Sequence, residues 1–137
     1  MSEAREALLH GTITDKIIKG FYYVYNELGP GFDEKVYENA LANWLRHRGF
    51  KVDQQKQILV YFEGQVVGDY RADLIVNDLV IVETKVLRMI APENEAQLVN
   101  YLKATDLEVG LLLNFGPDPE FRRRVFTNEK KKHRPPF

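Results

Sequence analysis

The chain has 137 residues, of which 45% are hydrophobic and 28% are charged, and its net charge at pH 7 is −1. This length and composition predict one globular domain that can bury a core of its own. With no cysteine and only three histidines, disulfides and thiolate zinc sites are excluded, and we expect any metal ion to be held by oxygen atoms. No apolar run approaches the ~20 residues of a membrane span and no signal-peptide pattern is present, which favours a cytoplasmic location without membrane contact.

Positive charge is concentrated near the C-terminus. From Pro119 to Phe137, seven Lys or Arg residues stand against two Glu residues, a net charge of +5 that leaves −6 for the rest of the chain. The segment 128–137 ends in Arg-Pro-Pro-Phe and is typical of a disordered, solubilising tail. The alternative is that this basic tail contacts phosphates. We therefore expect a single domain over residues 1–127, followed by the tail.

Two amphipathic helices are predicted in the first third of the chain, after a loose or partly helical arm that extends to about Gly11. The first helix begins at Thr14, a residue type that caps helix N-termini, and ends at the Gly-Pro-Gly sequence of 29–31. Asp33 is expected to cap the second helix, which ends before Gly49. Apolar side chains recur at helical spacing in both helices: Ile17, Ile18, Phe21, Val24, Tyr25 and Leu28 in the first, and Tyr37, Ala40, Leu41, Trp44 and Leu45 in the second.

The rest of the chain alternates strands with one further helix. Strands are predicted at 57–62, 65–76, 79–86 and 108–115, with a helix from Pro92 to about Ala104 between the last two. Gly68 can mark a bulge, and 121–126 is compatible with a short helix or an edge strand. Because a helix joins the third strand to the fourth, these two are expected to be parallel. The order α-α-β-β-β-α-β predicts an α/β fold with a mixed four-stranded sheet and flanking helices.

Three charged residues interrupt the most apolar part of the chain. Asp73 lies in the second predicted strand, and Glu83 and Lys85 end the third, after a continuous aliphatic run at 79–82. Residues at i and i+2 of a strand share a face, so Glu83 and Lys85 are neighbours. Two carboxylates beside an ammonium suit a hydrolase that uses a divalent metal ion. The alternative interpretation is a salt bridge that caps the strand.

The loop between these two strands decides whether the two acids can meet. A two-residue turn at Asn77-Asp78 would place Asp73 and Glu83 on opposite faces of the sheet. A three-residue connection at 77–79 would instead pair Val76 with Val80, and would set Asp73 opposite Glu83 and Arg71 opposite Lys85. A shared metal site therefore predicts the three-residue connection.

Four motifs in this chain resemble those of a known group of proteins. Asp73 with Glu83-Thr84-Lys85 resembles the D…ExK signature of the PD-(D/E)xK restriction-endonuclease-like superfamily. The segment 31–37, with Gly31, Glu34 and Tyr37, fits the G-x-x-E-x-x-Y pattern of the GxxExxY family of putative nucleases, and Gln97 with Tyr101 fits the Q-x-x-x-Y motif of RecB-like members. The resemblance extends from about Thr14 to Gly116 and implies a restriction-endonuclease-like core.

The resemblance implies a site and a reaction. Glu34, Asp73, Glu83 and the Thr84 carbonyl would hold Mg²⁺ or Mn²⁺, and Lys85 would position the attacking water for the hydrolysis of DNA. Gln97, Tyr101, Tyr37 and Arg71 would shape the site or touch the substrate.

Plainer interpretations stay open for several of these residues. Glu34 can simply complement the helix dipole, Gln97 and Tyr101 can be ordinary helix surface, and Arg71 can pair with an acid. At the level of the whole protein, the alternative is a catalytically silent module that binds nucleic acid or regulates a partner. The near-neutral net charge and small size favour a homodimer or a protein partner in that case.

Overall fold

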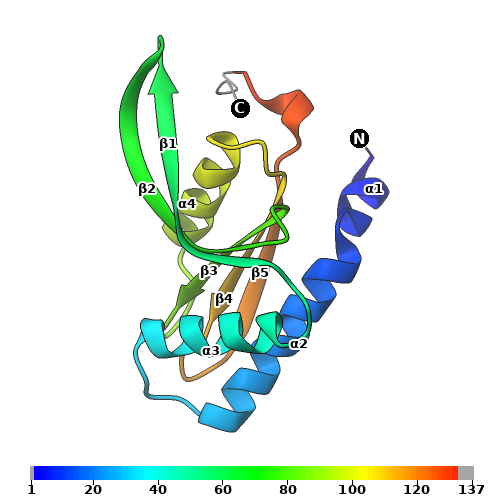
Figure 1. Cartoon of the computed structure of the whole chain (residues 1–137), viewed down its shortest axis with the longest axis vertical. Coiled ribbons are helices and arrows are strands. Elements are labelled where there is room, and N and C mark those ends of the chain that lie inside the picture. Colours follow the sequence, from blue (N-terminus) through cyan, green and yellow to red (C-terminus); the bar gives the residue numbers. More distant parts are fainter. Residues whose placement is uncertain (1, 133–137) are drawn as a thin grey trace.

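The structure of the protein is a computed structural model that describes residues 2–132, except for the side chains of residues 7 and 8 (Figure 1). These residues form the helices α1 (Glu3–Leu8), α2 (Gly11–Leu28), α3 (Glu34–Arg46) and α4 (Pro92–Lys103). They also form the strands β1 (Val52–Phe62), β2 (Gln65–Val76), β3 (Val80–Lys85), β4 (Val109–Asn114) and β5 (Glu120–Val125). A 3-10 helix, η1 (Asn128–Lys130), follows β5.

The strands form one mixed sheet in the order β1-β2-β3-β4-β5. Strands β3 and β4 are parallel, as the helix between them predicts, and the other neighbours are antiparallel. The expected four-stranded sheet was wrong by one strand, since residues 120–125 pair with β4 along its whole length. Because residues 122–124 are three arginines in a row, this segment lacks the alternation of apolar and polar residues that predicts a strand. At a sheet edge, however, the aliphatic stems of arginines can lie on the sheet while their charged ends reach water.

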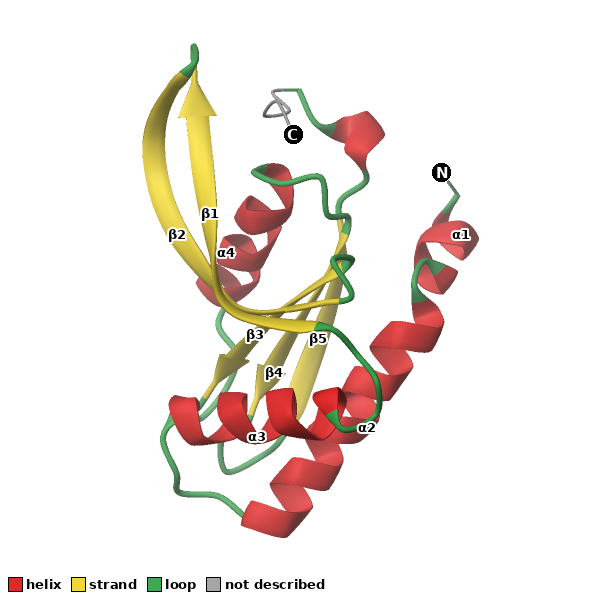
Figure 2. Ribbon diagram, in the orientation of Figure 1, coloured by secondary structure: helices red, strands yellow, loops and turns green. Residues whose placement is uncertain are grey.

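Helices cover both faces of the sheet (Figure 2). Helices α2 and α3 pack on one face, and α4 packs on the other through Leu98 and Leu102. Strands β3 and β4 are buried on both faces, as their aliphatic runs indicate. Among the described residues, no helix has both the length and the apolar character needed to span a membrane.

The ends of α2 and α3 follow largely from local sequence. The Asp33 carboxylate accepts the Val36 N–H at 3.2 Å and caps α3, and α2 ends before Gly29, which has a left-handed φ of 71°. Thr14 was expected to cap α2, but α2 begins at Gly11. The Thr14 hydroxyl donates to the Gly11 carbonyl at 3.1 Å, so Thr14 lies within the first turn.

The start of the predicted tail contacts the domain. The Lys130 ammonium lies 3.1 Å from a carboxylate oxygen of Glu6, and the Lys131 ammonium donates to the carbonyls of Thr105 and Leu107 at 2.7 and 2.8 Å. Residues 128–132 therefore make long-range contacts that local composition does not reveal. Residues 133–137, including Arg134, lie outside the described part of the chain.

The connection between β2 and β3 has three residues, as the shared metal site predicted. Val76 pairs with Val80, and the Leu79 N–H donates to the Val76 carbonyl at 3.0 Å. Asn77 and Asp78 both adopt left-handed φ angles, of 52° and 55°. This loop length sets the register of the two strands that carry Asp73 and Glu83.

Strands β2 and β3 separate immediately beyond this short ladder. Their last pair is Leu74 with Val82, so the expected pairs of Asp73 with Glu83 and of Arg71 with Lys85 do not form. Beyond this point β1 and β2 continue as a two-stranded arm, residues 56–72, which rises past α4 (Figure 1). Gln55 has a left-handed φ of 53° where the arm bends away, and the predicted bulge at Gly68 is present further along it.

Candidate active site

The carboxylates of Asp73 and Glu83 occupy the gap that opens between β2 and β3. One Glu83 oxygen accepts the backbone N–H of Asp73 at 2.9 Å. One Asp73 oxygen accepts both the N–H and the hydroxyl of Thr84, at 2.8 and 3.0 Å. The two acids thus take hydrogen bonds that the backbone ladder would otherwise make, which places both carboxylates between the strands.

The Thr84 carbonyl faces the same gap. In an extended strand, the N–H and C=O of one residue point to the same side. Because the Thr84 N–H donates to Asp73, its carbonyl is directed toward β2 as well. This geometry allows the backbone oxygen to join the two carboxylates as a third ligand for a cation.

Glu83 is a buried acid with an unusual affinity for its proton. Its exposed fraction is only 4%. Burial, followed by the nearby charge of Asp73, raises the pKa of Glu83 to about 8, although the hydrogen bond from the Asp73 N–H and the charge of Lys85 act in the opposite direction. A carboxyl group with this pKa keeps its proton near neutral pH and so cannot serve as the anion of a structural ion pair. A divalent cation beside it would restore the charged form.

Lys85 supplies the cationic group of the site. It is half-buried at the end of β3, two residues from Glu83 and on the same face of the strand. Within the part of the chain that the structure describes, its ammonium forms no ion pair or hydrogen bond. The salt bridge that would cap the strand is therefore not formed, and the ammonium is available to a substrate.

A third acid reaches the site from α3, and it is Glu38 rather than Glu34. Glu38 is only 3% exposed. The Gln55 amide nitrogen donates to Glu38 at 2.7 Å and to Asp73 at 3.2 Å, so a single donor bridges the two carboxylates. The charge of Glu38 also contributes to the raised pKa of Glu83. The structure places Glu34 in the exposed first turn of α3.

Glu38 was not among the predicted site residues, although the sequence contains a signal for it. Glu38 follows Tyr37 directly and lies three residues before Leu41, on the stripe that faces the sheet. A carboxylate on the buried face of a helix needs polar partners, and Gln54, Gln55 and Lys35 supply them. The GxxExxY pattern drew attention to the acid one turn earlier.

Tyr37 lies in the core, away from the acids. Its hydroxyl donates to the Gly29 carbonyl and accepts the Phe32 N–H at 3.3 Å. Its ring stacks on Phe115 with centroids 4.6 Å apart. These contacts tie the loop between α2 and α3 to the sheet, so Tyr37 fixes the position of the helix that carries Glu38.

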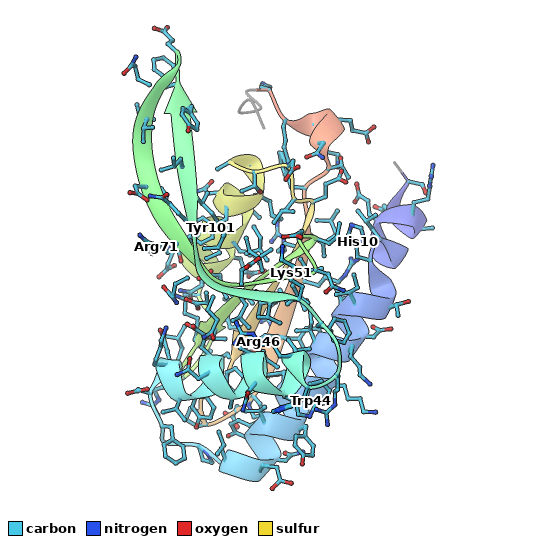
Figure 3. The ribbon with its side chains drawn as sticks, viewed as in Figure 1. His10, Trp44, Arg46, Lys51, Arg71 and Tyr101 are labelled. Carbon is cyan, nitrogen blue, oxygen red and sulfur yellow. The ribbon has the colours of Figure 1, made fainter. Side chains whose placement is uncertain are left out.

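Residues of α4 and of the arm border the site (Figure 3). Tyr101 is buried, with its ring 5.7 Å from that of Tyr70 in β2. Burial, followed by the charges of Glu83 and Asp73, raises the pKa of Tyr101 to about 12, so its hydroxyl stays a hydrogen-bond donor. Gln97 is half-buried one turn earlier on α4, and exposed Arg71 donates to the Gln55 carbonyl at 3.2 Å.

The donor set suits a hard divalent cation. Two carboxylates and a backbone carbonyl face one gap, and all three offer oxygen, which Mg²⁺ and Mn²⁺ prefer. Among residues 2–132, no three acidic or histidine side chains already converge closely enough to hold a metal ion. Glu38 meets Asp73 only through the Gln55 amide, so it would join the set once that amide moves.

A comparison with protein families identifies the group to which this site belongs. The model of the PD-(D/E)XK nuclease superfamily matches residues 11–125, which include every element of the sheet and the site. The chain belongs to the PD-(D/E)XK nuclease superfamily. Asp73 and Glu83-Thr84-Lys85 are the residues that fit the superfamily's name, with Ala72 in place of the proline. Nucleases of this superfamily act on nucleic acids and generally use divalent metal ions.

Solved structures support the fold. The protein described as "Crystal structure of SSO0001" is similar to this chain with a TM-score of 0.55 at 20% identity. The match covers 68% of this chain and 50% of the other, so this chain spans half the length of that protein. At this identity the likeness shows a shared fold and no more. No curated protein matches the chain.

Proposed function

We propose that this superfamily member is a metal-dependent nuclease that hydrolyses phosphodiester bonds in DNA. The observation that carries the proposal is the buried Glu83 carboxyl, held against Asp73 with the unpaired Lys85 ammonium on the same strand. Burying an acid in this way costs stability unless a cation compensates it. Such an arrangement is better explained by a metal site than by support of the fold.

Each residue has a role in this proposal. Asp73, Glu83 and the Thr84 carbonyl would hold Mg²⁺ or Mn²⁺, and the ion supplies charge neutralisation and a more acidic bound water. The Lys85 ammonium orients the attacking water and stabilises negative charge on the phosphate as the bond breaks. Tyr101 donates its hydroxyl proton in a hydrogen bond to a phosphate oxygen, and Gln97 borders the path of the backbone.

Glu38 takes the place that the motif assigned to Glu34. It is buried, charged and linked to Asp73 through one amide, whereas Glu34 faces solvent. If a cation displaced the Gln55 amide, Glu38 would be the further carboxylate available to hold it. The resemblance to the GxxExxY family, on Gly31, Glu34 and Tyr37, then reflects the conformation of the loop and helix that position Glu38.

A cleavage assay with a matched control tests the proposal. Supercoiled, linear and single-stranded DNA are incubated with the protein in Mg²⁺ or Mn²⁺, beside Lys85→Ala and Lys19→Ala. Lys19 is exposed on α2, on the opposite side of the sheet from α4. We expect EDTA to abolish cleavage, Lys85→Ala to lower its rate about 100-fold or more, and Lys19→Ala to cut like the wild type.

Equal background cleavage by the wild type and Lys85→Ala in both metals would refute the proposal that the protein is a nuclease. If that protein still bound DNA, the alternative of a catalytically silent binding module on the same fold would take its place.

A further inference from the structure

A groove opens between the arm and α4. Its volume is about 830 Å³, within the size range of ordinary ligand sites. Tyr70 and Tyr101 line it, with their rings 5.7 Å apart. Besides burial, the charges of Glu83 and Asp73 raise the pKa of Tyr101, so this end of the groove lies near the two acids. The arm rises from there along α4 toward η1 (Figure 1). Tyr101 thus borders both the groove and the proposed catalytic residues.

Aromatic side chains stand exposed along the arm side of this groove. Phe62 is 63% exposed, Tyr70 47% and Tyr61 39%, and all three line the groove. Tyr70 packs against Tyr101, but Tyr61 and Phe62 lie near the tip of a two-stranded arm that leaves the sheet, and no ring contact among the described residues accounts for them. Exposed aromatic rings that follow one another along a groove are the usual platform for unpaired bases.

Basic side chains border the same groove on its other side. Lys103, at the end of α4, and Lys130, Lys131 and Lys132, in and after η1, line it. Among the described residues that line it, only Glu93 is acidic. Lys130 and Lys131 are held by contacts with Glu6 and with backbone carbonyls, while Lys103 and Lys132 are exposed. The positive charge is therefore placed where a phosphate backbone could lie opposite the aromatic rings.

We propose that this groove binds single-stranded DNA, with bases stacked on Tyr61 and Phe62 and phosphates beside Lys103 and Lys132, and leads the strand to the acids. The inference rests on the proposed function for what happens at the acids, but strand binding itself needs no catalysis. It predicts that the preferred substrates are single strands or the single-stranded ends of a duplex.

The chemistry of the groove favours a single strand over a duplex. In a duplex, the faces of the bases are covered by their neighbours, so an exposed ring can stack only where bases are unpaired. The lysines provide charge complementarity to a phosphate backbone, which an apolar interface between two copies of this chain would lack.

Binding is measured by fluorescence anisotropy in EDTA, so that no cleavage occurs. The probes are a labelled 12-nucleotide single-stranded DNA of mixed sequence and the blunt duplex of the same sequence. The proteins are the wild type, Phe62→Ala, Tyr61→Ala and Lys103→Ala, with Tyr23→Ala and Lys19→Ala as controls for lost aromatic and basic side chains. Tyr23 is 50% exposed on α2, on the face of the sheet opposite α4. Circular dichroism confirms that each variant is folded.

We expect the wild type to bind the single strand at least about 10-fold more tightly than the duplex. Removing one stacking ring should weaken binding of the single strand by about 5- to 150-fold. Lys103→Ala should make the slope of log affinity against log salt shallower by about 0.7. Tyr23→Ala and Lys19→Ala should match the wild type.

Equal affinity for duplex and single strand would overturn the proposal that this groove binds single-stranded DNA. Wild-type affinity of both Phe62→Ala and Tyr61→Ala would overturn it as well. So would light scattering that shows a dimer which Phe62→Ala converts to monomers, because the groove would then belong to a subunit interface. The two proposals fail separately. Tight binding of single strands without cleavage would refute the nuclease and support strand binding in the groove. Cleavage at the wild-type rate by all of the groove variants would support the nuclease and refute the groove as its strand-binding site.

Discussion

Asp73 and Glu83 each accept a backbone hydrogen bond from the other's strand. Glu83 accepts from the Asp73 N–H at 2.9 Å, and Asp73 accepts from the N–H of Thr84, the residue after Glu83, at 2.8 Å. The exchange occurs one residue beyond the last regular pair, Leu74 with Val82. The two acids therefore take the backbone hydrogen bonds of the next ladder position, and the gap between β2 and β3 that they occupy is the place of the proposed metal site.

The stability of the metal-free protein should depend on pH through Glu83. Its pKa is raised from 4.5 to about 8 by burial and by Asp73, so the folded protein retains a proton that the unfolded chain releases. The stabilising contribution is fully present below pH 4.5 and is lost as the pH rises toward 8. The free energy of unfolding should fall by up to about 1.4 kcal/mol per pH unit over this window.

Urea unfolding of wild type and Glu83→Gln between pH 5 and pH 8, in EDTA, measures this contribution. We expect Glu83→Gln to lack this component of the pH dependence and to be the more stable protein at pH 8. Mn²⁺ should stabilise the wild type and not the variant. Parallel pH profiles for the two proteins would show that Glu83 is ionised in the folded state without a metal.

Replacing the two acids of α3 should separate their roles. Glu38→Gln removes a buried negative charge linked to Asp73, whereas Glu34→Gln changes an exposed residue in the first helical turn. We expect Glu38→Gln to lower the cleavage rate or the affinity for Mn²⁺ about 10- to 100-fold, and Glu34→Gln to change neither by more than about twofold. The assay is cleavage as a function of Mn²⁺ concentration. A larger loss for Glu34→Gln than for Glu38→Gln would restore the assignment made by the motif.

In the metal-free protein, the Gln55 amide should occupy the position that the cation would take between the acids. Its amide bridges Glu38 and Asp73, and its backbone has a left-handed φ of 53°. Gln55→Ala and Gln55→Gly both remove the bridging amide, but only glycine relieves the backbone. We expect Gln55→Gly to be more stable than Gln55→Ala by about 1–2 kcal/mol in urea unfolding.

Both Gln55 variants should also gain more stability from Mn²⁺ than the wild type does, because no amide has to be displaced. The comparison is the change in melting temperature on adding Mn²⁺ to each protein. A smaller gain in the variants would mean that the amide is part of the metal site rather than a competitor.

Tyr37 should contribute to stability and not to the reaction. Tyr37→Phe keeps the ring on Phe115 and removes the hydrogen bonds to Gly29 and Phe32. We expect a loss of about 0.5–1.5 kcal/mol in the free energy of unfolding, with the cleavage rate per folded molecule unchanged at 25 °C. A large loss of activity in a fully folded Tyr37→Phe would place this hydroxyl in the site after all.

Local spacing in the sequence determined much of this molecule. The aliphatic runs of β3 and β4 identify strands buried on both faces, and Pro92 and the 29–31 sequence bound two helices. The alternation of a strand places Glu83 and Lys85 together, and the need to bring Asp73 to them predicts the three-residue loop that the structure contains. Each of these inferences uses the geometry of one element or one hairpin, which neighbouring residues largely set.

Only the tertiary structure decided which residues of different elements meet. Glu34 and Glu38 lie one turn apart on the same side of α3, so which of them reaches Asp73 depends on where α3 lies along its axis on the sheet, and packing against the core sets that position. The separation of β2 from β3, the edge strand β5 and the groove beside α4 likewise arise from long-range contacts. A side chain's direction within its own element follows from the local backbone, but its partners follow from the burial of surfaces that lie far apart in the chain.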